Sequence, residues 1–277
     1  MSEQCSQVGA DADSDAAAAE IWKRLINIRL MPLLEAALNG SRSLEEHPAI
    51  PRSPEELAAA SLGAVEAGAA VLHLHVYDGG GRETFAASSC AAAIRAVRAS
   101  CPHIPISLTT SSSIEPDPRR RLDIISRWTE LPDLVTANQG EEGIAQLCDH
   151  LIARGVGIEA GLLTRSDAEA FVRSGIAERC VRVLIEPLDS EPEKAVAHAA
   201  SMEECILAAD IFLEQVHHGD GIASWAVSAR SASRGHGIRT GLEDTTLLPS
   251  GRRAKDNAEL VRAAAALQVA SGRDGTG

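Results

Sequence analysis

The sequence has few aromatic side chains: phenylalanine, tryptophan and tyrosine together make up 3% of its 277 residues. It has no apolar run near the ~20 residues that a membrane-spanning helix requires, and no apolar leader segment at its start. Its six cysteines are scattered and form no C-x-x-C pair. We therefore expect an aliphatic core, no membrane partner, and reduced thiols in a cytoplasmic protein.

Positive charge is scarce as well. The chain has 26 lysines and arginines against 39 aspartates and glutamates, which gives a formal net charge of -13. Binding to nucleic acid requires a clustered basic face, so this balance argues against a nucleic-acid partner. An anionic small-molecule substrate is still compatible with it, because one arginine can reverse the field inside a pocket.

The start of the chain differs in composition from the rest. Residues 1–20 are rich in Ser, Asp, Glu and Ala and contain almost no large apolar side chain. Such a segment buries too little surface to order itself, which predicts a disordered tail. Because no linker-like stretch divides residues 21–277, we expect them to form one catalytic domain.

Apolar, strand-like runs alternate with helix-like segments along that domain. The helix-like segment that begins at Pro54, for example, has Ser53 as its N-cap. Eight such strand–helix units predict parallel strands with right-handed crossovers, and a chain of this length favours a single (β/α)8 TIM barrel. The absence of a G-x-G-x-x-G fingerprint argues against the competing fold, a doubly wound open sheet. The predicted strands are 33–38, 71–76, 106–110, 134–138, 157–162, 181–186, 212–217 and 238–244.

The predicted strand 71–76 contains two histidines separated by one residue, His73 and His75. Because side chains alternate along a strand, both imidazoles should point to the same face of the sheet. A glycine-rich segment, 77–82, follows directly. Neighbouring neutral imidazoles are typical zinc ligands, although two hydrogen-bonded core histidines would have the same spacing.

Catalytic residues of a TIM barrel lie where the strands end and the following loops begin. Among the polar residues at these ends, Glu159 and Glu186 are expected in a polar network of the barrel interior. Of the adjacent His217 and His218, at most one can join a given site, because neighbouring strand residues point in opposite directions. The other polar residues at the strand ends are Asn39, Arg42, His73, His75, Thr109, Thr110, Ser111, Thr136, Asn138, Arg239, Glu243 and Asp244.

The last predicted strand supplies a third candidate metal ligand. Alternation puts Arg239, Gly241 and Glu243 on one face, and Asp244 follows where the strand breaks into the loop. A closed barrel brings strand eight beside strand one and near strand two, so Glu243 should face the two histidines. Two imidazoles and one carboxylate, with positions open for substrate, suit a catalytic Zn²⁺. The structural alternative is a buried ion pair between Arg239 and Glu243.

These residues resemble the β-keto acid cleavage enzymes, a family that includes the 3-keto-5-aminohexanoate cleavage enzymes. The resemblance covers nearly the whole chain after residue 30. Its most specific part is the segment 237–244, with the sequence G-I-R-T-G-L-E-D. The segment 69–82 matches the family's H-x-H-x-x-D-x-x-G-R motif. Further matching segments are 37–42, 134–138, 248–251, 255–261, and His47-Pro48 with Pro51 downstream.

The resemblance implies a zinc-dependent TIM barrel that is usually a homotetramer. Enzymes of this family condense a β-keto acid with acetyl-CoA and then cleave the carbon skeleton by a retro-Claisen step. The products are acetoacetate and a new acyl-CoA. By position, His73, His75 and Glu243 would hold the metal.

Catalytic and substrate-binding roles follow from the same resemblance. Asp244 would be the general base that removes the α-proton, and Arg239 would orient it. Thr109 and Thr136 fall where the family binds the substrate carboxylate. Asn39, at the end of the first strand, is also expected at the substrate site.

The sequence departs from the family beside the expected substrate. Tyr77 stands where many members have an arginine, and Ser111 and Ser112 replace glycines. Arg42 stands where members that act on an amino-bearing β-keto acid have a glutamate. We therefore expect Ser111 to reshape the carboxylate pocket, and Arg42 to pair with a second anionic or polar group on the substrate.

Two other functions fit the same residues. A metal-dependent aldolase or hydrolase on the same barrel would act without any thioester. A non-catalytic barrel would bind a metabolite without turning it over, but the presence of all three ligands, the base and Arg239 argues against it.

Overall fold

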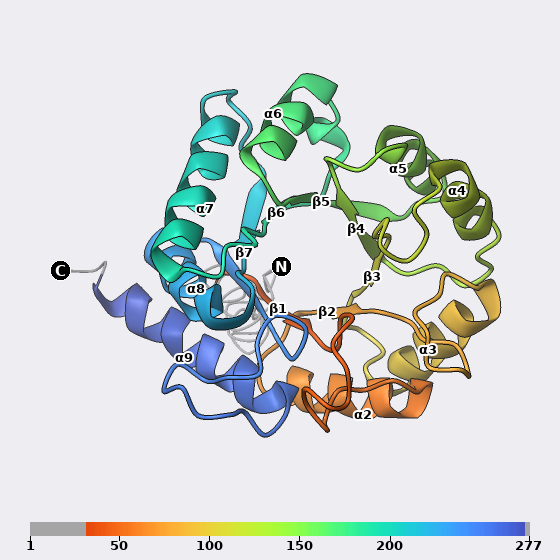
Figure 1. Ribbon diagram of the computed structural model, residues 1–277, viewed down its shortest axis with the longest axis horizontal. Helices are drawn as coiled ribbons and strands as arrows, with labels where there is room; N and C mark the ends of the chain where they lie inside the picture. The colour runs from red at the N-terminus through yellow and green to blue at the C-terminus, as the bar shows by residue number, and fades with distance from the viewer. Residues whose placement is uncertain (1–31, 275–277) are drawn as a thin grey trace, which may run out of the picture. The chain divides into compact units, whose positions relative to one another are not determined.

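Eight parallel strands close into a barrel within residues 32–274, the part of the chain that this computed structural model describes (Figure 1). Each strand pairs with the next along the chain, and the last pairs with the first, so that Ile238 lies opposite Leu34. This arrangement confirms the predicted single (β/α)8 barrel. The strands are β1 (Leu34–Ala37), β2 (Val71–Leu74), β3 (Ile106–Thr109), β4 (Leu134–Asn138), β5 (Gly157–Leu162), β6 (Arg182–Ile185), β7 (Glu214–His217) and β8 (Gly237–Thr240).

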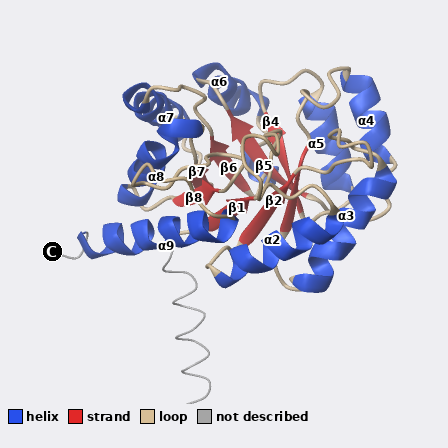
Figure 2. Cartoon of the chain, turned by 60° about the horizontal axis from the view of Figure 1, so that its bottom comes forward, coloured by secondary structure: helices blue, strands red, loops and turns tan. Residues whose placement is uncertain are grey.

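Helices follow the strands and cover the outside of the barrel (Figure 2). Among the helices of residues 32–274, none is long and apolar enough to cross a membrane. The α-helices are α2 (Pro54–Glu66), α3 (Ala87–Ser100), α4 (Pro118–Ser126), α5 (Ile144–Ala153), α6 (Arg165–Ser174), α7 (Pro192–Leu207), α8 (Ser224–Ser233) and α9 (Asn257–Asp274), with short 3-10 turns at Ala177–Arg179 and Gly221–Ala223.

The first of these helices begins as the sequence predicts. The Ser53 side chain accepts a hydrogen bond from the backbone N–H of Glu56, and the Glu56 carboxylate accepts one from the backbone N–H of Ser53. Pro54 occupies the first helical position, where its missing N–H costs nothing. The core between helices and strands consists mainly of Ala, Leu, Ile and Val, as the scarcity of aromatics predicts.

Five strands end earlier than predicted, and the difference is largest in β2, by two residues, and in β8, by four. The strand β2 ends at Leu74 and β8 ends at Thr240, so His75, Glu243 and Asp244 lie just beyond the strands. At the end of β8 the cause is Gly241: a Cβ atom there would lie 1.9 Å from the carbonyl oxygen of Ala37. The main chain of β8 therefore passes directly against β1 and turns away, with the Asp244 N–H donating to the Gly241 carbonyl at 3.0 Å.

The predicted tail of residues 1–20 lies outside the described residues, as do both ends of the predicted domain, 21–277.

Candidate active site

A pocket of about 330 Å³ opens at the carboxyl ends of the strands. The predicted metal ligands, the predicted base, Arg239 and three of the predicted substrate-binding residues line it. Asn39 and Arg42 are not among its lining residues. Of the predicted site residues, the pocket wall contains His73, His75, Thr109, Ser111, Thr136, Arg239, Glu243 and Asp244.

The Glu243 carboxylate lies between the two histidines. Its Oε1 is 3.5 Å from Nε2 of His75, and its Oε2 is 3.7 Å from Nε2 of His73. Tetrahedral zinc ligands with bonds of about 2.0–2.1 Å lie roughly 3.3 Å apart, which is close to this spacing. The buried Oε2 of Glu243 also has no hydrogen-bond partner in the described structure. Donor type, spacing and this unpaired oxygen fit a divalent transition metal.

In each histidine the second ring nitrogen, Nδ1, contacts a further side chain. Nδ1 of His73 lies 3.3 Å from both Ser107 Oγ and Thr136 Oγ1. Nδ1 of His75 is hydrogen-bonded to the Glu83 carboxylate. Such contacts fix the tautomer and the ring orientation of a metal-binding histidine, leaving Nε2 for the metal. The sequence analysis did not identify Glu83. Its position directly after the G-R of the segment 69–82 could have indicated that it belongs to the site.

The two histidines differ in charge. Burial lowers the pKa of His73 to about 3, so that this ring is neutral. Burial also opposes the charged form of His75, but Glu243 and Glu83 outweigh it and raise the pKa of His75 to about 9. Arg239 and the histidines overcome the burial of Glu243 and hold its pKa well below the usual value. A metal ion would take the place of the proton on His75.

Arg239 joins the metal-ligand group to the predicted base. Its Nη2 donates to Glu243 Oε1 and to Asp244 Oδ1, each at 2.7 Å. Burial of Asp244 disfavours its carboxylate, but Arg239 and His218 outweigh burial and lower its pKa. The second oxygen of Asp244, Oδ2, is buried and has no hydrogen-bond partner among the described residues. The arrangement holds an ionised carboxylate in the pocket wall with one free oxygen.

The adjacent histidines at the end of β7, His217 and His218, point in different directions, as the alternation of a strand predicts. His218 joins the site: its Nδ1 lies 3.2 Å from Asp244 Oδ1 and its Nε2 lies 3.5 Å from Glu186 Oε2. His217 instead faces α7 and α8, where its ring stacks on that of His236 with centroids 4.8 Å apart. The sequence left open which of the two histidines would join the site.

Three residues with hydroxyl side chains line the pocket at the ends of β3 and β4: Thr109, Ser111 and Thr136. Thr109 and Thr136 are register partners on these strands. Thr109 Oγ1 accepts the backbone N–H of Ser111 at 3.2 Å, and Ser111 Oγ lies 2.9 Å from Ser113 Oγ. These hydroxyls offer donors toward the pocket, as expected for binding a carboxylate.

Asn39 and Arg42 contact main chain. Asn39 is fully buried, and its amide donates to the carbonyls of His75 and Pro51 while its oxygen accepts the His75 N–H. It therefore ties the end of β1 to the end of β2. Arg42 donates to the carbonyl oxygens of Glu243 and Asp244.

A second group of polar residues fills the barrel interior below the pocket. Glu159, which pairs with Arg182 at 3.1 Å, accepts a hydrogen bond from Ser107. Burial, together with the neighbouring Glu159, raises the pKa of Glu35 well above its usual value. The interior network expected for Glu159 is thus present, whereas Glu186 lies in the pocket wall.

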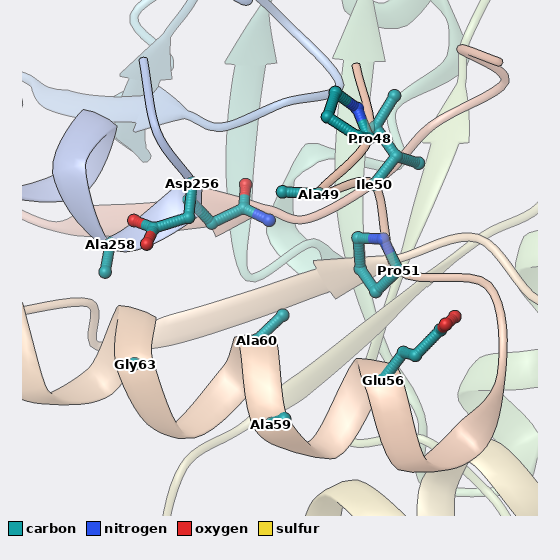
Figure 3. A pocket seen from close by; sticks show the side chains of 11 residues that line it. Pro48, Ala49, Ile50, Pro51, Glu56, Ala59, Ala60, Gly63, Asp256 and Ala258 are labelled. Atoms are coloured by element: carbon teal, nitrogen blue, oxygen red, sulfur yellow. The ribbon is translucent and has the colours of Figure 1, made fainter. Parts of the chain in front are cut away.

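A second hollow of similar size lies between α2 and the start of α9 (Figure 3). Small and apolar side chains such as Ala59, Ala60 and Ile50 line it. Its two carboxylates already serve as helix caps: Glu56 caps α2, and Asp256 Oδ1 accepts the N–H of Glu259. The hollow therefore lacks a free catalytic group, and the chemistry of the described residues gathers in the pocket at the strand ends.

The pocket combines a candidate metal site, a carboxylate that could act as a base, and hydroxyl groups that could bind an anionic substrate. Three ligands leave a tetrahedral metal at least one open position, as catalytic zinc requires. A metal next to a base suits removal of a proton from carbon beside a carbonyl group.

Comparisons with known proteins point to the same chemistry. A profile of the family described as beta-keto acid cleavage enzyme matches residues 32–205 and 193–275. A 3-keto-5-aminohexanoate cleavage enzyme from Fusobacterium nucleatum subsp. nucleatum is 26% identical over 255 residues, which cover 87% of this chain and 93% of that protein.

Solved structures share the fold. ObcA bound to oxaloacetate superposes with a TM-score of 0.66 at 17% identity, over 81% of this chain and 64% of that one. A ternary complex of ObcA with a C4-CoA adduct and oxalate has a TM-score of 0.65 at 18% identity, over 81% of this chain and 65% of that one. The chain therefore spans less than two thirds of the length of ObcA.

Proposed function

Since the chain belongs to the β-keto acid cleavage enzyme family, we propose that it uses acetyl-CoA to convert a β-keto acid into acetoacetate and a new acyl-CoA. In the first half of this reaction, the acetyl group leaves the CoA sulfur and joins the α-carbon of the β-keto acid. In the second half, the original acyl group leaves that carbon for the CoA thiol. No oxidant or reductant is needed.

The observation that carries the proposal is the position of Glu243 and Asp244. Glu243 lies within 3.7 Å of both imidazoles, and the next residue along the chain, Asp244, lines the same pocket and carries a carboxylate oxygen with no hydrogen-bond partner among the described residues. Metal ligand and base are thus fixed by one short turn. ObcA, which shares the fold, has been crystallised with oxaloacetate and with a CoA adduct, which supports a β-keto acid and a CoA thioester as substrates.

His73, His75 and Glu243 would hold the metal, which we propose to be zinc. When bound, a Lewis-acidic metal polarises a carbonyl group and acidifies the neighbouring C–H bond. Asp244 takes up the α-proton at its free Oδ2. Its lowered pKa makes it a weak base, which suffices for a carbon acid acidified in this way. Arg239 holds Asp244 ionised and turned toward the pocket.

Thr109 and Thr136 are proposed to bind the substrate carboxylate. Both side chains reach the pocket from adjacent strands, and both lie on the wall that also contains Ser111. Ser111 adds a hydroxyl where the family has glycine, which narrows this wall. Asn39 is proposed to act from outside the pocket, by holding the main chain of His75.

Two neighbouring variants test the proposal. We expect Asp244→Asn to keep zinc at one ion per chain. The variant should lower kcat by about 10²–10⁴-fold, which is the usual contribution of a general base to the rate. We expect Glu243→Gln to lose stoichiometric zinc. The assay is acetoacetate formation from acetyl-CoA with a panel of β-keto acids. Full activity of Asp244→Asn, or unchanged zinc in Glu243→Gln, would contradict the assignment.

The same panel separates the alternatives. Cleavage that proceeds without acetyl-CoA would instead favour an aldolase or a hydrolase. Binding without turnover across the panel would favour a metabolite-binding barrel. The homotetramer expected from the family belongs to this proposal and is tested by light scattering of the purified protein.

A further inference from the structure

Arg42 lies in the loop between β1 and α2, and its guanidinium donates hydrogen bonds to the turn that follows β8. Its Nε donates to the Glu243 carbonyl oxygen at 2.8 Å, and its Nη2 donates to the Asp244 carbonyl oxygen at 3.2 Å. These two residues carry the proposed third metal ligand and the proposed base. One side chain therefore holds the main chain of both.

Two carboxylates keep the guanidinium in this position. Arg42 Nη2 lies 2.7 Å from Asp220 Oδ1, and Nη1 lies 3.3 Å from Glu46 Oε1. The loop of Asp220 contacts the same turn, because the Gly221 N–H donates to the Asp244 carbonyl at 2.7 Å. The β1, β7 and β8 loops thus meet at Arg42.

The loop that carries Arg42 is itself held by Tyr77. The Tyr77 hydroxyl donates to the carbonyl of Gly40, and the Arg52 guanidinium donates to the carbonyl of Arg42. The Arg52 guanidinium also lies over the Tyr77 ring, 3.8 Å from its centroid. Tyr77 and Arg42, the two large departures from the family beside the substrate, therefore belong to one contact network.

From these contacts we infer that Arg42 is a positioning residue, which fixes the turn 241–245 so that Glu243 and Asp244 point into the pocket. Four of its five N–H donors are directed to the two main-chain oxygens and to Asp220 and Glu46, which leaves at most one, on Nη1, for a substrate. The inference rests on the proposed roles of Glu243 and Asp244. It differs from the role predicted from the sequence, in which Arg42 pairs with a polar group of the substrate.

The two roles make opposite predictions for Arg42→Met, which keeps an unbranched apolar stem but removes every donor. A positioning role predicts that zinc affinity falls by about tenfold or more, as for other residues that orient metal ligands. It also predicts that kcat falls while KM for the β-keto acid changes by less than about threefold. A substrate-binding role predicts unchanged zinc affinity and a raised KM.

A measurement without substrate or metal separates this inference from the proposed function. In zinc-free protein, Arg42→Met should speed hydrogen–deuterium exchange of the backbone amides of residues 241–245, because their carbonyl anchors are gone. Faster exchange and weaker zinc binding would support the positioning role even if no β-keto acid in the panel is turned over. Unchanged exchange with zinc affinity within about twofold of wild type would overturn it.

Arg42→Lys provides a second variant if Arg42→Met does not fold. An ammonium group can reach one of the two carbonyls but cannot span both, so exchange and zinc affinity should fall between those of wild type and Arg42→Met. Arg127→Met is the matched control, because Arg127 is exposed and pairs only with Asp123 in its own helix region. It should leave zinc affinity and exchange of residues 241–245 as in wild type. A lysine variant no different from wild type would contradict the need for a two-carbonyl contact.

Discussion

Nδ1 of His218 lies 3.2 Å from Oδ1 of Asp244, the oxygen that also accepts a hydrogen bond from Arg239. Both side chains are almost fully buried. One carboxylate oxygen is thus occupied by two neighbours, while Oδ2 is buried and has no hydrogen-bond partner among the described residues. The contact turns the Asp244 carboxylate and helps to keep it ionised.

Replacing His218 should weaken the base without removing the metal. His218 lowers the pKa of Asp244, so in His218→Ala this pKa rises. Because the base must be ionised, the acid limb of the pH profile of kcat/KM should move to higher pH, and kcat should fall by about tenfold or more. Zinc content should equal that of wild type. An acid limb at the wild-type pH would contradict a link between His218 and Asp244.

Glu83 is expected to strengthen metal binding through His75. Glu83→Gln replaces the carboxylate that holds Nδ1 of His75 and should weaken zinc binding by about 10–100-fold. Competition with a chelating dye measures this change. The control is Glu130→Gln, because Glu130 is a partly exposed residue outside the pocket, paired with Arg95 at 3.2 Å. Equal zinc affinity in the two variants would remove Glu83 from the metal site.

The contact between Gly40 and Glu243 leaves no room for a side chain. A Cβ atom at Gly40 would lie 2.4 Å from Cγ of Glu243, and the φ of Gly40 is +56°, which favours glycine. Gly40→Ala should therefore displace Glu243, weaken zinc binding by about tenfold, and lower the free energy of unfolding by about 1–2 kcal/mol. Gly79→Ala is the control, because a Cβ there meets no atom within 4 Å. Zinc affinity equal to that of the control would disprove the contact.

His217, which lies outside the pocket and stacks on His236, should make the free energy of unfolding depend on pH. Burial lowers the pKa of His217 to about 3 from 6.5, so the unfolded chain binds a proton in this window that the folded chain does not. The free energy of unfolding should therefore fall as pH decreases from 6.5 toward 3, with a slope of up to about 1.4 kcal/mol per pH unit from this group. His217→Asn should reduce the slope, measured by urea unfolding, whereas His103→Asn, at an exposed position, should not. An unchanged slope in His217→Asn would refute the assignment.

The sequence was sufficient to predict the barrel because its pattern is local and repeated. Eight apolar runs alternate with helix signals, and a closed parallel barrel is the fold that such a pattern favours. The spacing of His73 and His75 was likewise enough to predict a shared face. The strand ends were less accurate, because the end of β8 is set by the contact of Gly241 with Ala37, which lies far away in the sequence.

Two contacts of the site were not predicted from the sequence. Glu83 reaches His75 from eight residues downstream, and His218 reaches Asp244 from another strand end. Neither contact follows from helix or strand periodicity. For Asn39, the strand-end position was read correctly, but hydrogen bonds to the main chain of His75 occupy its amide, and no periodicity could indicate this.

The most direct test of the proposed reaction follows the acetyl group. Wild-type protein loaded with zinc is incubated with acetyl-CoA carrying heavy carbon in both acetyl positions and with the best β-keto acid of the panel, and the products are analysed by mass spectrometry. The proposed function predicts both heavy carbons in acetoacetate and none in the new acyl-CoA. Unlabelled acetoacetate, or cleavage of the β-keto acid at the same rate without acetyl-CoA, would contradict it.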